Sequence, residues 1–216
     1  MGDRQTVPSG LLQQTRLFRY HPYQWKPCVV SEQRFMSLIA GNLGVVQRTL
    51  DAYQIAWAVC AGAAAHLYGN RRPIQDIDIL IEPGRLPDVV RLLNQQQKVV
   101  QFDGQRILWR GIKIFDDLTI RRGREVYPFT LDADMRSRVR RLPLLGSLVP
   151  VLSPEDVALH KAVLARGPEE GKHDLADAVA IVRRQAFDYD YVQRRLALMR
   201  ANGSATTVLA RIGIEL

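Results

Sequence analysis

One stretch of this chain, residues 56–82 (AWAVCAGAAAHLYGNRRPIQDIDILIE), constrains its fold more than any other. Its order predicts a strand, a tight turn, a short helix, a loop and a second strand. The apolar run 56–60 leads to Gly62, which suits a sharp turn or the close approach of a ligand to the backbone. Good helix formers follow over 63–68, and Gly69 ends the predicted helix before the second strand, 75–81.

The second strand alternates apolar and acidic side chains. Ile77, Ile79 and Ile81 fall on a face that can pack, and Asp76 and Asp78 fall together on the other face. Two carboxylates two residues apart on a strand repel each other, and a hard divalent cation held by oxygen ligands is the commonest compensation. The alternative interpretation is that both aspartates form only the solvated face of an edge strand.

The glycine turn complements the two aspartates. A helix that begins at Gly62–Ala63 directs free N–H groups and partial positive charge outward, which favours a phosphate group. The run AGAAAHLYGNRRPIQDIDILI resembles the polymerase-β-like nucleotidyltransferases, whose signature is a Gly-Gly or Gly-Ser turn, a short helix and an hDhD strand. The spacing matches, but Ala61 stands in place of the first glycine and Ala63 in place of a frequent serine.

This resemblance implies an α+β (α/β-like) fold, the nucleotidyltransferase fold, with a mixed sheet flanked by helices and a C-terminal helical part. It also implies Mg²⁺-dependent transfer of a nucleoside monophosphate from an NTP to an acceptor hydroxyl. Two Mg²⁺ ions would be held by Asp76, Asp78 and a third carboxylate. Residues 61–63 would receive the phosphates of the NTP. Arg71 and Arg72 would add positive charge, or they are ordinary surface residues.

The third carboxylate is expected at Asp116 or Asp117. A hairpin is predicted around Asp103-Gly104, and its second arm, 105–120, carries these two residues. If alternation continues through Lys113, then Lys113 and Asp117 share the polar face, whereas Asp116 lies with the isoleucines. The pattern therefore favours Asp117, a β-bulge would favour Asp116, and a plain turn would use neither.

A second resemblance involves the segment VLSPEDVALHKAVLARGPEEGKHDLADAVAIV. Ser153 is the predicted N-cap of a helix that ends near Arg166 and carries Lys161 in its apolar stripe. The segment is similar to the C-terminal part of nucleotidyltransferase toxins of the abortive-infection class, in which a helix lysine and a later aspartate belong to the active site. Lys161 and Asp174 match, with Asp177 one turn further. The alternatives are a lysine that reaches solvent along its own stem and an Asp174 that caps the helix 175–184.

The remaining pattern predicts three parts: an irregular N-terminal arm (1–30), a nucleotidyltransferase α/β domain (31–150) and a C-terminal helical subdomain (151–216). In the second part, helices are expected from Ser31 to Gly41, over 43–53 and over 86–93. The arm interleaves aromatic and basic side chains, which fits either packing on the domain or stacking with single-stranded nucleic acid.

The net charge of the chain indicates which classes of partner it favours. Thirty Lys and Arg against 22 Asp and Glu give a net charge of +8, which favours polyanions but also serves solubility. Arg136, Arg138, Arg140 and Arg141 form either a solvated face or a phosphate-binding patch. Two cysteines predict neither a disulfide framework nor a zinc site. Without a signal peptide or an apolar run of membrane-spanning length, we expect a cytoplasmic protein with no membrane partner.

Three functional readings follow. The first is the magnesium-dependent nucleotidyltransferase, whose acceptor stays open between an RNA or tRNA 3′ end, a small alcohol and a protein hydroxyl; the net charge favours RNA. The second is a non-catalytic nucleotide- or RNA-binding module on the same fold, which the departures at Ala61 and Ala63 favour. The third is the toxin component of a toxin–antitoxin pair, whose cognate antitoxin protein blocks or completes the cleft.

Overall fold

The computed structural model describes residues 32–201 and 204–214. The described residues from 32 onward belong to one compact unit, residues 31–216. The predicted N-terminal arm and the expected N-cap Ser31 lie outside the described residues. The predicted boundary at residue 150 falls near the end of the last strand, and the helices that follow it belong to the same compact unit.

A mixed sheet forms the centre of this unit. Within the described residues it has seven strands in the order β3-β4-β5-β2-β1-β9-β8. Their bounds are β1 Trp57–Cys60, β2 Ile77–Ile81, β3 Gln101–Phe102, β4 Arg106–Trp109, β5 Ile112–Phe115, β8 Arg140–Leu144 and β9 Ser147–Val151, and a separate hairpin pairs β6 Ile120–Arg122 with β7 Glu125–Tyr127.

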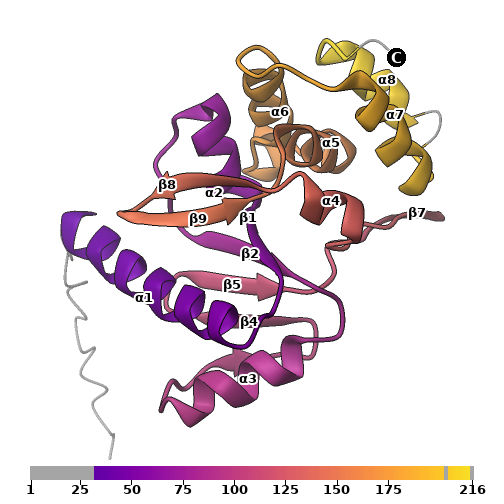
Figure 1. Cartoon of the computed structure of the whole chain (residues 1–216). Helices are drawn as coiled ribbons and strands as arrows, with labels where there is room; N and C mark the ends of the chain where they lie inside the picture. Colours follow the sequence, from indigo (N-terminus) through magenta and orange to yellow (C-terminus); the bar gives the residue numbers. More distant parts are fainter. Residues whose placement is uncertain (1–31, 202–203, 215–216) are drawn as a thin grey trace, which may run out of the picture. The chain divides into compact units, whose positions relative to one another are not determined.

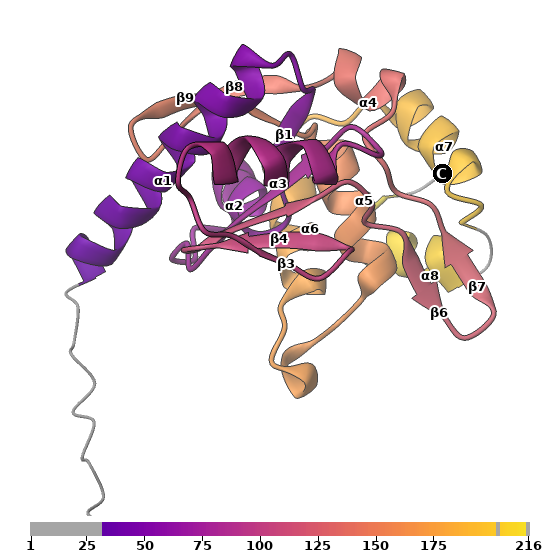
Figure 2. The same cartoon turned by 90° about the horizontal axis from the view of Figure 1, so that it is seen from below.

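Helices cover both faces of the sheet. In Figure 2, α1 (Glu32–Ala52) and α3 (Leu86–Gln95) lie in front of the strands, and α2 (Ala61–Ala65), α5 (Pro154–Leu164) and α6 (Asp174–Val182) lie behind them. Figure 1 shows α7 (Tyr189–Leu198) and α8 (Ser204–Arg211) beside α5. The remaining helical segments are η1 His66–Asn70, α4 Ala133–Ser137 and η2 Pro168–Glu170. The α+β class, with a C-terminal helical part, is confirmed.

Strand β2 is central because its two neighbours fix the surroundings of Asp78. It pairs antiparallel with β1, which places Asp78 opposite Cys60. It pairs parallel with β5, which places Asp78 opposite Lys113. All of β1 is buried, as are Ile77, Ile79, Leu80 and Ile81 of β2, so both faces of these strands are covered except at Asp78. The alternative of a solvated edge strand is therefore wrong.

Three local predictions are corrected. Gly41 does not end a helix, because the buried side chains of Ile39, Leu43, Val46 and Leu50 form one continuous stripe that holds α1 together from residue 32 to 52. Helix α2 begins at Ala61 rather than at residue 63. The arm 105–120 is not one strand, because Arg110 and Gly111 have φ values of 46° and 85° and turn the chain between β4 and β5.

Among the described residues, no helix combines the length and the apolar character that crossing a membrane requires.

Candidate active site

A cleft of about 660 Å³ opens where the turn after β1, the middle of β2 and the end of β5 face α5 and the segment before α6. It contains an excess of cationic over acidic side chains. The cations that line it are Arg106, Lys113, Arg121, Lys161, Arg166 and Lys172, and the carboxylates are Asp78, Asp103, Asp117 and Asp174. A concave site with this balance suits an anionic ligand.

Asp78 is a partly buried carboxylate on β2, a central strand of the sheet. Burial raises its pKa to about 6, and the negative charge of Asp76 adds to this rise, whereas Lys113, Lys161 and Lys172 oppose it. The carboxylate thus lies in an environment that disfavours its ionised form despite three lysines close enough to influence it. A cation bound at Asp78 would relieve this cost.

Asp76 lies just before β2 and forms an ion pair with Lys113. Its side chain lines a neighbouring hollow of about 360 Å³ with Gly111 and Lys113, whereas Asp78 lines the main cleft and Lys113 lines both. The two aspartates therefore influence each other electrostatically but open into different hollows.

The structure separates the two candidates for the third carboxylate. Asp116 turns to the loop after β2, where it accepts a hydrogen bond of 2.9 Å from the backbone N–H of Gly84. Asp117 lines the cleft with Asp78 and accepts a hydrogen bond of 2.7 Å from the N–H of Thr119. Of the two, only Asp117 lines the cleft that Asp78 lines.

The turn between β1 and α2 differs from its prediction in detail. Ala61 has a φ of 49° and lines the cleft. The left-handed conformation thus falls on Ala61, where the family signature has its first glycine, and costs on the order of 1 kcal/mol for a residue with a Cβ. Gly62 is helical, and a Cβ at that position would meet no atom within 4 Å. Ala63 is buried beneath it.

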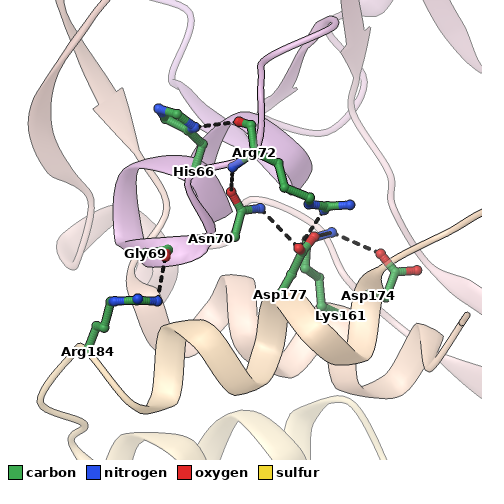
Figure 3. Close-up of polar contacts among 8 residues, drawn as sticks. All are labelled: His66, Gly69, Asn70, Arg72, Lys161, Asp174, Asp177 and Arg184. Carbon is green, nitrogen blue, oxygen red and sulfur yellow. Dashed lines mark hydrogen bonds and ion pairs between the residues drawn. The ribbon is translucent and has the colours of Figure 1, made fainter. Parts of the chain in front are cut away.

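Lys161 is held by two aspartates (Figure 3). Its side chain is 6% exposed, and Nζ lies 2.9 Å from Asp174 Oδ1 and 2.7 Å from Asp177 Oδ2. The Nε of Arg166 lies 2.6 Å from the other oxygen of Asp174. The alternative in which Lys161 reaches solvent is therefore wrong, and the ammonium lies in the wall of the cleft.

Asp177 connects this cluster to the loop before β2. Its Oδ1 accepts hydrogen bonds of 2.5 Å from Arg72 Nη2 and 3.0 Å from Asn70 Nδ2 (Figure 3). Asp174 is not the N-cap of α6, because His173 occupies that position and the carboxylate is engaged by Lys161 and Arg166. Neither Arg71 nor Arg72 lines the cleft; Arg72 binds Asp177, and Arg71 is exposed at a left-handed backbone position.

Several cations of the cleft were not predicted from the sequence. Arg121 and Lys172 line the cleft without an ion pair to a described carboxylate, whereas Arg106 pairs with Asp103 and Arg166 with Asp174. Nothing in the local sequence distinguishes Arg121 or Lys172 from other surface cations, because only the folded chain brings β6 and the segment before α6 to the same cleft.

The donor set fits a hard cation in part. Asp78 and Asp117 offer carboxylate oxygens to the cleft, and Asp76 lies within electrostatic reach of Asp78. Among the described residues, however, no three His, Cys, Asp or Glu side chains are gathered closely enough to form a complete metal site. Asp76 is engaged by Lys113 instead.

The arginines of residues 136–141 do not form one free basic patch. Arg136 pairs with Glu82 at 3.4 Å, and Arg138 pairs with Asp188 at 2.6 Å and stacks over the Tyr191 ring at 4.0 Å. Arg140 and Arg141 are consecutive exposed residues of β8, so their side chains point to opposite faces of the strand. The solvated-face interpretation accounts for these contacts.

No protein-family model and no curated protein matches this chain. Among solved structures, ANT(2'')-Ia in complex with adenylyl-2''-tobramycin is 11% identical over 75% of this chain and 97% of that chain, with a TM-score of 0.49. The lincosamide antibiotic adenylyltransferase LnuA is 15% identical over 65% and 96%, with a TM-score of 0.42. An antigenic nucleotidyltransferase-like protein from Paracoccidioides brasiliensis is 19% identical over 83% and 94%, with a TM-score of 0.44.

The second of these proteins is named as an adenylyltransferase and the third as a nucleotidyltransferase-like protein. The chain resembles the polymerase-β-like nucleotidyltransferases in its signature residues and nucleotidyltransferases in the solved structures to which it is similar.

Proposed function

We propose that this chain is a Mg²⁺-dependent nucleotidyltransferase that moves a nucleoside monophosphate from an NTP to an acceptor hydroxyl. The observation that carries the proposal is the composition of the cleft. A partly buried carboxylate, Asp78, shares it with two cations that lack a described carboxylate partner, Arg121 and Lys172. A triphosphate bound with a metal ion would satisfy both the carboxylate and the cations.

Each part of the cleft has a task in this proposal. Asp78 and Asp117, with Asp76 nearby, would hold Mg²⁺, which when bound activates the acceptor hydroxyl and neutralises the departing pyrophosphate. Arg121 and Lys172 would bind phosphate oxygens. Ala61, at the turn after β1, lines the cleft and would border the bound phosphates, whereas Gly62 does not line it.

Lys161 and Asp174 would act mainly on the shape of the cleft. The Lys161 ammonium is shared between Asp174 and Asp177. If it moved to a phosphate, both buried carboxylates would lose this cationic partner, which is energetically unfavourable. From there its positive charge still acts to lower the pKa of Asp78. We therefore assign two roles to Lys161: it stabilises the wall of the cleft, and it contributes to the positive electrostatic potential there. It does not bind phosphate directly.

For the acceptor, we extend the proposal to the 3′ end of an RNA, with tRNA as the first case to test. Its support is the charge of the chain, +8, and the excess of cations in the cleft. Transfer to RNA should then weaken steeply between low and physiological salt concentration. Transfer that is independent of salt would favour a small alcohol as the acceptor.

A non-catalytic nucleotide-binding module is the second candidate. The observation that favours it is the ion pair between Asp76 and Lys113, which engages one of the two signature aspartates. Such a module would bind NTP in the cleft and release it unchanged.

One experiment separates these two functions. The full-length chain is incubated with α-labelled NTPs, Mg²⁺ and total RNA or tRNA, and both label transfer and NTP binding are measured. The nucleotidyltransferase transfers label, and EDTA abolishes transfer; binding without transfer supports the module. Asp117→Asn should lower transfer at least tenfold more than Asp116→Asn, a matched change at the carboxylate that faces Gly84.

A cognate antitoxin protein is the remaining partner to test, and we propose it on the resemblance of the C-terminal segment to nucleotidyltransferase toxins. Co-purification of the tagged chain with a protein that blocks NTP binding to the cleft would support it. Full transfer activity in the presence of every co-purifying protein would contradict it.

A further inference from the structure

Lys113 occupies an unusual place among the residues of the cleft. Register pairs it with Asp78 across the parallel strands β2 and β5, and its ammonium forms the ion pair with Asp76. It lines both the main cleft and the hollow that Asp76 lines. A single fixed positive charge therefore lies beside both signature aspartates.

The side chain is also well placed to remain there. It comes from the middle of β5, between the buried Ile112 and Ile114, so the strand fixes the direction of its stem. From that position the ammonium reaches the Asp76 carboxylate, and the side chain lines both hollows. A divalent cation that bound the Oδ2 of Asp76 would have to displace this ammonium.

We propose that Lys113 takes the place of one metal ion, so that the site binds a single divalent cation, at Asp78, instead of the two ions expected from the sequence. This inference rests on the proposed function, because it concerns the metal site of the same cleft. Lys113 supplies one of the positive charges that Asp76 and Asp78 would otherwise draw from a second ion. Lys113 is thus a positioning residue that sets the number of ions.

The experiment counts ions directly. Mn²⁺ alone is titrated into the full-length chain, and bound ions per chain are measured by electron paramagnetic resonance and calorimetry. We expect one ion in the wild type, none at this site in Asp78→Asn, and two in Lys113→Met, which keeps the stem and removes the charge. Lys113→Arg, which keeps the charge, should bind one ion.

The double variant Lys113→Met/Asp76→Asn tests where the second ion binds, and it should return to one ion. Two ions in the wild type, or one ion in Lys113→Met, would overturn the inference while leaving the proposed function intact. Absence of binding in both would contradict the proposed function and this inference with it. Because Lys113 is about one-third exposed, thermal unfolding of Lys113→Met should stay close to that of the wild type.

Discussion

Helix α5 carries two buried charge clusters that differ in what borders them. On one side, Asp156 is 0% exposed, accepts hydrogen bonds from the Ser153 and Tyr191 hydroxyls and lies 3.2 Å from Arg195 Nε. On the other side, Lys161 binds Asp174 and Asp177. None of the first group lines the cleft, whereas Lys161 and Asp174 do.

The difference follows from helix geometry. Positions 156 and 161 are five residues apart, which places their side chains on different faces of the helix. The Asp156 cluster joins α5 to α7 and, through the pair between Arg195 and Asp132 at 2.5 Å, to the N-cap of α4. Buried charge by itself therefore indicates a role in holding helices together. It points to function only where the cluster opens into the cleft.

The largest effect on stability is expected on the side away from the cleft. Arg195→Met leaves Asp156 buried without its cation and should lower the free energy of unfolding by about 3–5 kcal/mol. NTP binding by the folded fraction should be unchanged. Arg194→Met, at the neighbouring exposed position, is the matched control and should cost less than about 1 kcal/mol in urea unfolding. Equal losses of unfolding free energy in the two variants would contradict the structural role that we assign to the buried Arg195 cluster.

Lys161→Met should affect both stability and the cleft. Asp177 keeps Arg72 and Asp174 keeps Arg166, so the loss of unfolding free energy should be smaller, about 2–3 kcal/mol. NTP binding should weaken several-fold, because a positive charge near Asp78 is removed. Lys98→Met, a lysine outside the cleft, should change neither quantity. Unchanged NTP binding in Lys161→Met would place its cluster in the same purely structural role as that of Asp156.

His160 lies on α5 between the two clusters and adds a dependence on pH. Burial lowers its pKa to about 4, with the positive charges of Lys161 and Arg166 adding to the fall, while its contact with the Leu118 carbonyl and the charge of Asp174 oppose it. The folded chain therefore holds it neutral, whereas the unfolded chain protonates it near pH 6.5.

Above pH 6.5, His160 is neutral in both the folded and the unfolded chain, and it does not lower stability. As the pH falls from 6.5 toward 4, protonation of His160 in the unfolded chain should lower the free energy of unfolding by an amount on the order of 2–3 kcal/mol. Urea unfolding as a function of pH should show this slope in the wild type and in His173→Gln, an exposed control, but less of it in His160→Gln. The same slope in all three proteins would show that other groups cause the acid sensitivity.

The sequence predicts local features well because neighbouring residues determine them. The alternation over 75–81 predicted β2, and the Ser153-Pro154 pair predicted the start of α5, where Ser153 accepts a hydrogen bond from the Asp156 N–H. Failures occur where distant contacts override a local signal. Gly41 is compatible with a helix end, but the buried stripe on either side of it continues α1.

The candidate site was predictable only in part for the same reason. Asp78 and Lys161 follow from motifs. Alternation predicted that Lys113 and Asp117 share a face; both line the cleft, although Asp117 lies beyond the end of β5. That Lys113 stands opposite Asp78 depends on β2 pairing with β5, two strands separated by a helix and a hairpin. The partner of Asp174 likewise depends on how α6 packs against α5, so the local pattern left a helix cap open as an alternative.

The central claim is that the cleft around Asp78 performs nucleotidyl transfer, and one variant tests it most directly. Asp78→Asn keeps the shape of the side chain and removes its charge; the matched control is Asp88→Asn, on the first turn of α3. Label transfer from NTP in a Mg²⁺ titration should fall by about 100-fold or more in Asp78→Asn and stay near the wild-type rate in Asp88→Asn. Without metal, Asp78→Asn should be as stable as the wild type or more so, because a buried charge is gone. Equal transfer by the wild type and Asp78→Asn at every Mg²⁺ concentration would contradict the account.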